Sequence, residues 1–173
     1  MTYRQFPRFD ETNAPGTARD ALLTNKRIFG AIPEPLRRYA GSPLMLGTAL
    51  SGLQAFETSS LLPLEREVLA MTMGRLNDCK FCLNFHRRML TAHKAPAELV
   101  QALEAGHPLA DARLEALRSF ILALLEHHGD VPRETWTSFR EAGYSHEQAL
   151  EVVTGVAVYT LTTFANRLTE TSE

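Results

Sequence analysis

The apolar positions of this chain recur mostly at the spacing of an α-helix. Between residues 112 and 126 they follow one another at steps of three, four, three and one, with charged residues between them. This spacing places them on one stripe of a helix. The members of the stripe are Leu114, Leu117, Ile121, Leu124 and Leu125. A shorter segment with Leu99, Val100 and Leu103 has the same pattern.

Residues that typically begin and end helices lie at the borders of these segments. Pro63, Pro96 and Pro132 are placed for first-turn positions, and Gly129 and Gly143 for C-terminal caps. No pair of alternating apolar segments meets at a hairpin dipeptide. The pattern therefore predicts an all-α fold.

One segment, Val152 to Phe164, conflicts with this pattern because it is rich in valine and threonine, which favour strands. It follows Ser145 and Gln148, which have the spacing of a capping box, and no partner strand is predicted. We therefore predict a helix here. A helix with so little charge must be buried on most sides, either at an oligomer interface or in the core, and the sequence favours neither.

The N-terminal end of the chain lacks helical spacing. Residues 1–16 contain Pro7 and Pro15, together with Phe6 and Phe9, which suit an arm packed on the body or on a neighbour. Residues 17–173 show no repeat and no low-complexity linker. We expect an N-terminal arm, 1–16, followed by a single helical domain, 17–173.

Composition narrows the class of function. The 173 residues are 45% hydrophobic and 22% charged, with a net charge of −2 and no basic patch, so nucleic-acid binding has no electrostatic support. The N-terminus lacks the apolar core of a secretory signal, and the longest apolar run is too short to cross a bilayer. We expect a cytoplasmic protein without a membrane partner. In that compartment two cysteines suggest redox chemistry or a metal rather than a structural disulfide.

Both cysteines lie in the stretch NDCKFCLNFH, residues 77–86. Asn77 or Asp78 is expected to cap a helix that starts near Cys79. Cys79, Cys82 and His86 then share one helix face, and the two cysteines are within reach of a disulfide.

The spacing also suggests roles for these residues. His86 is one turn from Cys82 and two turns from Cys79, so Cys82 is the candidate nucleophile and His86 its base. Cys79, nearer the helix start and expected to be more exposed, would be the resolving thiol. Glu65 and Glu67 are both candidates to orient His86, and spacing alone does not choose between them.

The residue types in this cluster also bind metals. A zinc or iron site would use Cys79, Cys82, His86 and Glu67, but three ligands on one helix face make a poor tetrahedron and no second ligand pair exists. We therefore expect no metal. A pair of core thiols beside an unrelated histidine is disfavoured as well, because a base follows the second cysteine at the right offset.

The stretch EREVLAMTMGRLNDCKFCLNFH resembles the core of the AhpD-like alkylhydroperoxidases, in the carboxymuconolactone decarboxylase superfamily. The family pattern has a glutamate, a C-x-x-C pair that begins twelve residues later, and a histidine four residues after the second cysteine. Glu67, Cys79, Cys82 and His86 match it. Ile32 to Leu50 and Phe164 to Thr171 also resemble the peroxidase-related branch.

The resemblance implies an all-helical domain that assembles into homotrimers or homohexamers. It implies a thiol peroxidase that reduces a hydroperoxide at Cys82, with Glu67 and His86 as proton relay and Cys79 completing the disulfide. No bound cofactor is implied, and the reductant would be an external dithiol such as a lipoyl-bearing protein. One departure is Phe81, because well-studied members have a histidine there.

Two alternatives remain beside this interpretation. A redox sensor or a thiol–disulfide exchange protein would use the same cysteine pair. A decarboxylase or lactone-processing enzyme of the same superfamily is disfavoured, because such members generally lack the C-x-x-C pair.

Overall fold

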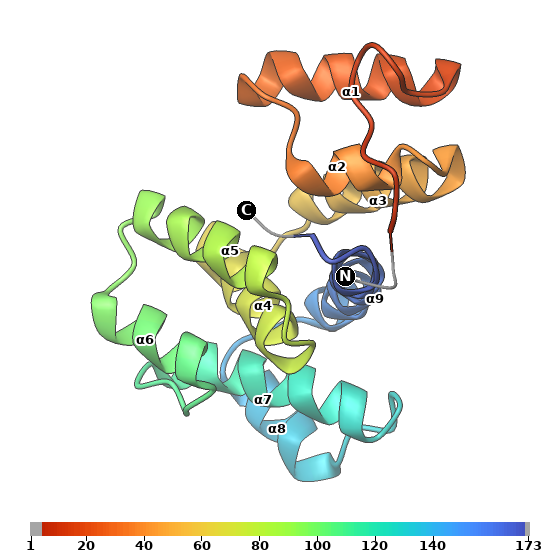
Figure 1. The fold of residues 1–173 in the computed structure, drawn as a ribbon. Helices are drawn as coiled ribbons and strands as arrows, with labels where there is room; N and C mark the ends of the chain where they lie inside the picture. Colours follow the sequence, from red (N-terminus) through yellow and green to blue (C-terminus); the bar gives the residue numbers. More distant parts are fainter. Residues whose placement is uncertain (1–4, 172–173) are drawn as a thin grey trace.

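The computed structural model describes residues 5–171, and every regular element in that range is a helix (Figure 1). The helices are α1 (Gly16–Phe29), α2 (Glu34–Tyr39), α3 (Pro43–Glu57), α4 (Pro63–Leu76), α5 (Lys80–Ala92), α6 (Ala97–Ala105), α7 (Ala112–Glu126), α8 (Arg133–Glu141) and α9 (His146–Leu168). The predicted all-α fold is confirmed. None of these helices is long and apolar enough to cross a membrane.

Proline and glycine mark the helix ends close to the predicted positions. Pro63 is the first residue of α4, while Pro96 and Pro132 occupy the N-cap positions of α6 and α8. Proline fits there because the first turn has no intrahelical acceptor for the N–H that proline lacks. Gly129 and Gly143 follow α7 and α8 with φ angles of 93° and 89°, in the left-handed region that glycine adopts without strain.

The valine- and threonine-rich segment is helical and forms the middle of α9, as predicted. Ser145 and Gln148 make the expected capping box, with Ser145 Oγ accepting from the Gln148 amide at 3.0 Å. The hydroxyls of Thr160, Thr162 and Thr163 each donate to the carbonyl four residues earlier, at 2.5–3.1 Å. These bonds satisfy the threonine hydroxyls within the helix.

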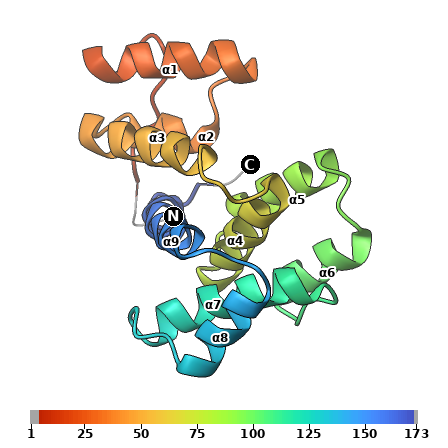
Figure 2. The same ribbon diagram turned by 180° about the vertical axis from the view of Figure 1, so that it is seen from behind.

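The helices form two groups that share α9 (Figures 1 and 2). We call α1–α3 the N-terminal lobe. Its core includes Leu22, Leu36 and Leu46, and it packs against Leu161 and Ala165 of α9. The larger core joins α4–α9 and extends to Phe56 at the end of α3. Helix α9 therefore lies between the lobe and the α4–α8 group.

Residues 5–15, the described part of the chain before α1, form no helix and run along the N-terminal lobe. The Phe9 amide donates to the Arg37 carbonyl at 3.0 Å, and Arg38 donates to the Phe6 carbonyl at 2.7 Å. Residues 1–4 of the predicted arm and residues 172–173 of the predicted domain lie outside the described range, and the proposed boundary between arm and domain stays a prediction.

Candidate active site

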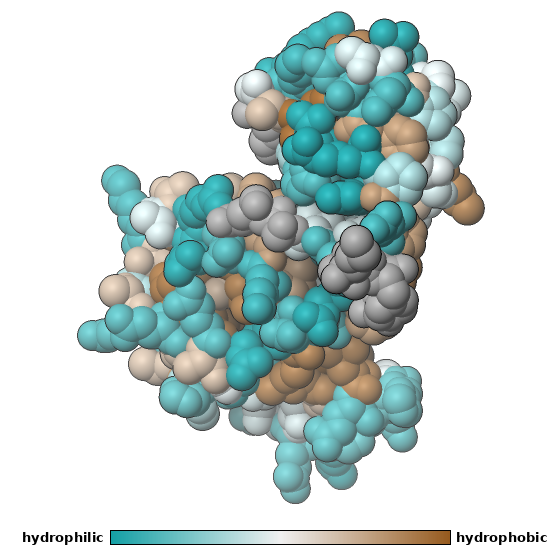
Figure 3. Space-filling view, viewed as in Figure 1, coloured by the Kyte–Doolittle hydropathy of each residue, from teal (hydrophilic) through white to brown (hydrophobic). Residues whose placement is uncertain are grey.

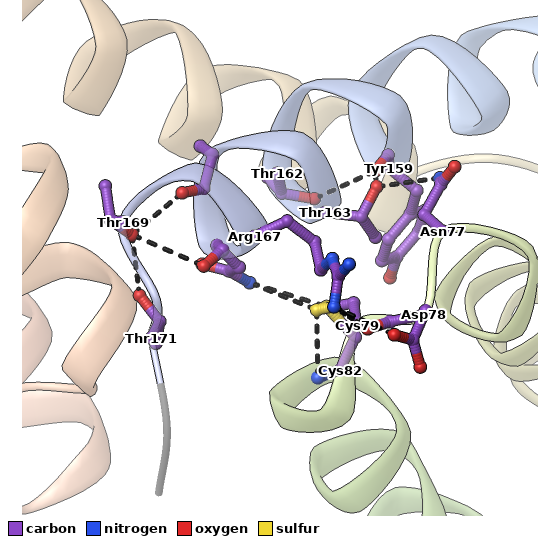
Figure 4. Close-up of a disulfide and its surroundings, with 12 residues drawn as sticks. Asn77, Asp78, Cys79, Cys82, Tyr159, Thr162, Thr163, Arg167, Thr169 and Thr171 are labelled. Carbon is purple, nitrogen blue, oxygen red and sulfur yellow. Dashed lines mark hydrogen bonds and ion pairs between the residues drawn. A yellow bond between two sulfur atoms is a disulfide. The ribbon is translucent and has the colours of Figure 1, made fainter. Parts of the chain in front are cut away.

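Cys79 and Cys82 form a disulfide where the chain turns from α4 into α5 (Figure 4). Their Cα atoms are 5.3 Å apart. Cys79 is itself the N-cap of α5, and its sulfur accepts a hydrogen bond from the Cys82 amide at 3.3 Å. One of the free N–H groups at the helix start therefore points at a sulfur atom.

The predicted N-cap, Asn77 or Asp78, is wrong. Helix α4 continues to Leu76, so that Asn77 is its C-cap, and Asp78 has a left-handed φ of 48° that turns the chain into α5. The Asp78 carboxylate instead pairs with Arg167 of α9 at 2.8 Å, as Figure 4 shows. The turn that carries the cysteines is thus tied to α9.

The expectation that Cys79 is the more exposed cysteine is also wrong. Cys79 is 2% exposed and Cys82 5% exposed. Cys79 is covered because Asn166 of α9 lies against both sulfur atoms, a contact between segments far apart in the chain.

Glu67 and His86 form a buried pair between α4 and α5. His86 Nδ1 and Glu67 Oε2 are 2.8 Å apart, and both residues are buried. An ionised carboxylate only accepts hydrogen bonds, so in the tautomer that bonds to it Nδ1 carries the hydrogen and Nε2 is the ring nitrogen that Glu67 does not hold. His86 lies one helical turn beyond Cys82 on α5.

The choice between the two glutamates, which spacing left open, follows from their contacts. Glu65 Oε2 accepts from the Leu62 amide at 2.8 Å, and its Oε1 accepts from Arg113 at 2.9 Å. Glu65 is therefore engaged in capping α4 and in an ion pair with α7. Glu67 is the carboxylate that the structure brings to His86.

Aromatic rings enclose the histidine. The His86 ring makes edge contacts with Phe85 and Tyr159, at centroid distances of 5.2 and 5.3 Å. Burial, reinforced by the nearby Glu67 carboxylate, raises the pKa of Tyr159, so its phenol stays protonated. Phe81 stacks on Phe85 at 6.1 Å, which places an apolar ring at the position where the resemblance implied a second histidine.

Sequence reasoning missed two residues near the disulfide. Asn166 contacts both sulfurs, and Tyr39 contacts Asn166. The Asn166 amide nitrogen lies 3.4 Å from Cys82 Sγ and 3.7 Å from Cys79 Sγ. Tyr39 of the N-terminal lobe contacts the Asn166 amide oxygen at 2.6 Å. Asn166 belongs to the stretch FANRLTET, which carried part of the resemblance, but no local spacing links it to cysteines 84 or more positions away.

Within residues 5–171, no three or more His, Cys, Asp or Glu side chains are grouped so that they could hold a metal ion. The chemistry that this arrangement supports directly is thiol–disulfide chemistry, with a buried histidine one helical turn from Cys82.

No family model matches the sequence, and no curated protein matches it. Solved structures do resemble it. A structure from Ralstonia eutropha JMP134, described as an alkylhydroperoxidase AhpD core and an uncharacterized peroxidase-related protein, is 17% identical with a TM-score of 0.82, over 96% of this chain and 90% of that one. An uncharacterized peroxidase-related protein from Silicibacter sp. TM1040 is 19% identical with a TM-score of 0.80, over 99% and 94%. The chain therefore has the AhpD-like fold that its sequence suggested.

Proposed function

We propose that this protein is a thiol peroxidase that reduces hydroperoxides through Cys79 and Cys82. The observation that carries the proposal is the Cys79–Cys82 disulfide, with the hydrogen-bonded Glu67–His86 pair one helical turn beyond Cys82. The AhpD-like fold and the peroxidase-related descriptions of its structural neighbours support the same chemistry.

The reaction begins from the dithiol. His86 Nε2 accepts the Cys82 proton, and the thiolate attacks the terminal oxygen of the hydroperoxide. An S–O bond forms, the O–O bond breaks, and the alkoxide leaves as an alcohol with the proton returned by His86. The Cys79 thiol then attacks the sulfenic acid of Cys82, which forms the disulfide and releases water.

Glu67 has a positioning and electrostatic role in this scheme. Its hydrogen bond to Nδ1 fixes the ring orientation and the tautomer, and its negative charge stabilises the imidazolium that forms when Cys82 is deprotonated. The pair is buried, so this interaction is weakly screened by solvent.

An external dithiol would return the enzyme to its reduced form. Cys79 is the better leaving group because its sulfur accepts the Cys82 amide hydrogen bond at the start of α5. The reductant thiolate therefore attacks Cys82 Sγ and releases Cys79 as a thiolate. The reductant's second thiol then displaces Cys82 and becomes part of a new disulfide. A lipoyl-bearing protein in the cytoplasm is the proposed donor.

We also propose that the protein works as a homo-oligomer, a trimer or hexamer, with the outer face of α9 in the interface. Leu150, Val153, Phe164 and Leu168 on this helix are 46–71% exposed. Phe164 and Leu168, with Met45 and Leu161, line an open groove of about 820 Å³. Apolar surface is also visible in the lower half of the face in Figure 3. Phe164→Glu would place a charge in this interface and convert the oligomer to monomers, which light scattering on a sizing column measures.

The peroxidase proposal is tested by stopped-flow oxidation of the reduced protein with tert-butyl hydroperoxide. Mass analysis of the products follows both cysteines. A fast reaction that yields one Cys79–Cys82 disulfide and is lost in Cys82→Ser supports the proposal. In Cys79→Ser the fast phase should remain and end at a sulfenic acid on Cys82. Oxidation no faster than that of a free thiol would reject it.

Thiol–disulfide exchange is the second candidate function. It is favoured by the Cys79 sulfur at the N-cap of α5, a position that stabilises a thiolate, and by the apolar Phe81 next to Cys82. Rapid exchange with a dithiol, combined with slow oxidation by the hydroperoxide, would identify this function.

A further inference from the structure

Asn166 is a buried amide whose hydrogen-bond donor faces both cysteine sulfurs. It is 4% exposed, and its Nδ2 lies 3.4 Å from Cys82 Sγ and 3.7 Å from Cys79 Sγ. The sulfurs of a disulfide carry no hydrogen and can only accept hydrogen bonds. The amide nitrogen of Asn166, rather than its oxygen, is therefore the atom that faces them.

Tyr39 holds this amide from the opposite side. Its hydroxyl is 2.6 Å from Asn166 Oδ1 and 3.0 Å from the Thr162 carbonyl oxygen. Burial raises the pKa of Tyr39, so the phenol keeps its one proton, and Asn166 Oδ1 is the nearer of the two acceptors to which it can donate. Because Tyr39 belongs to α2, the orientation of the amide depends on a contact that crosses from the N-terminal lobe to α9.

We infer that Asn166 is a catalytic residue whose amide hydrogen bonds stabilise the cysteine thiolates, and that Tyr39 is the positioning residue that aims this amide. The inference shares one assumption with the proposed function, namely that the cysteine pair cycles between dithiol and disulfide. It does not require that the oxidant be a hydroperoxide.

The physical reason is a difference in acceptor strength. A hydrogen bond to an ionised acceptor is about twice as strong as one between neutral groups, so the amide binds a thiolate more strongly than a disulfide sulfur. When a dithiol reductant attacks Cys82 Sγ, the Cys79–Cys82 bond breaks and its electron pair stays on Cys79 Sγ. Asn166 is already in contact with the sulfur that receives this charge.

Packing alone does not explain why an asparagine is buried at position 166. Burying an amide costs free energy unless its groups are hydrogen-bonded, and the partners of the Asn166 side chain are Tyr39 and the two sulfurs. Asn77 offers a matched comparison, because its amide donates to Thr163 Oγ1 at 2.9 Å, also between the cysteine turn and α9.

The test compares Asn166→Leu with Asn77→Ala and the unmodified protein. Two quantities are measured without any peroxide: the pH midpoint of alkylation of the reduced protein by iodoacetamide, and the disulfide equilibrium with dithiothreitol. Loss of one hydrogen bond to a charged group predicts a shift of about 1–2 pH units in the midpoint and of about 10- to 150-fold in the disulfide equilibrium constant. In Asn166→Leu the midpoint moves to higher pH and the equilibrium moves toward the disulfide, while Asn77→Ala shows neither change.

The charged or titratable groups of the cysteine turn and of the His86 cluster are present in all three proteins, so a difference between the proteins reports the Asn166 amide. These groups are Asp78 with Arg167, and His86 with Glu67 and Tyr159. Thermal melts check folding, and Asn166→Ala repeats the measurement if the leucine variant is misfolded.

Tyr39→Phe tests the positioning role. It should shift both quantities in the same direction by a smaller amount, and should add nothing in an Asn166→Leu background, since the Tyr39 hydroxyl reaches the sulfurs through that amide. Unchanged quantities in both Asn166 variants would overturn the catalytic role, and additive effects of the two substitutions would overturn the role of Tyr39. A peroxidase proposal rejected by stopped flow would leave these results unaffected.

Discussion

Replacing Glu67 by glutamine separates the proton relay from the packing of the site. The substitution keeps the size of the side chain but removes the charge that faces His86 Nδ1 at 2.8 Å. The amide can also donate to Nδ1, which would move the ring hydrogen to Nε2 and block its action as a base. Both effects disfavour deprotonation of Cys82.

The magnitude follows from the hydrogen bond that is lost. A hydrogen bond to a charged group contributes about 1.5–3 kcal/mol, and each 1.36 kcal/mol is a factor of ten in rate. The Glu67→Gln protein should therefore be oxidised by a hydroperoxide about 10- to 150-fold more slowly. The assay is stopped-flow oxidation of the reduced protein between pH 5 and pH 9.

Glu65→Gln is the matched control, because it makes the same chemical change two residues away on α4. Glu65 is 1% exposed and holds Arg113 and the Leu62 amide, without a contact to His86. Its replacement should lower the free energy of unfolding by about 1–3 kcal/mol and leave the oxidation rate nearly unchanged. Equal oxidation rates for Glu67→Gln and the unmodified protein across the pH range would refute the relay.

Two further predictions concern packing and the departure from the family pattern. In Gly155→Ala the new Cβ would lie 2.6 Å from the Phe56 ring, which should cost about 1–3 kcal/mol, whereas Gly47→Ala in α3 has open space and should gain up to about 1 kcal/mol. Thermal melts that show the same sign for both would contradict the packing of α9. Phe81→His should speed peroxide oxidation because it adds a proton carrier directly before Cys82, and an unchanged stopped-flow rate would contradict this.

The parts of the site that lie close together in the sequence were predictable. Cys79, Cys82 and His86 follow from helical spacing, and Glu67 follows from the preceding helix once the family pattern is considered. The N-cap was missed because Asp78 is a good capping residue by type, while its left-handed backbone depends on where α4 ends. The exposure of Cys79 was wrong for a similar reason, since α9 covers it.

Asn166 and Tyr39 could not be derived from local patterns. Tyr39 is separated from Asn166 by 127 positions, and the contact exists only because the N-terminal lobe packs on α9. A buried asparagine in a helix has the same local signature as an exposed one. Only the tertiary arrangement distinguishes them.

The sequence left open whether α9 is a core helix or an interface helix. The burial of its residues suggests that it can be both. Its polar side chains Thr162, Thr163 and Asn166 are at most 8% exposed, whereas Phe164 and Leu168 are about half exposed. This is the reverse of the amphipathic pattern of a surface helix, in which apolar residues face the core. Two members of this polar face serve the disulfide and its turn, because Asn166 faces the sulfurs and Thr163 accepts from Asn77, while the Thr162 hydroxyl is satisfied within the helix. The exposed apolar face is the part that the proposed homo-oligomer would cover, and in that assembly one helix would serve both the core and the interface.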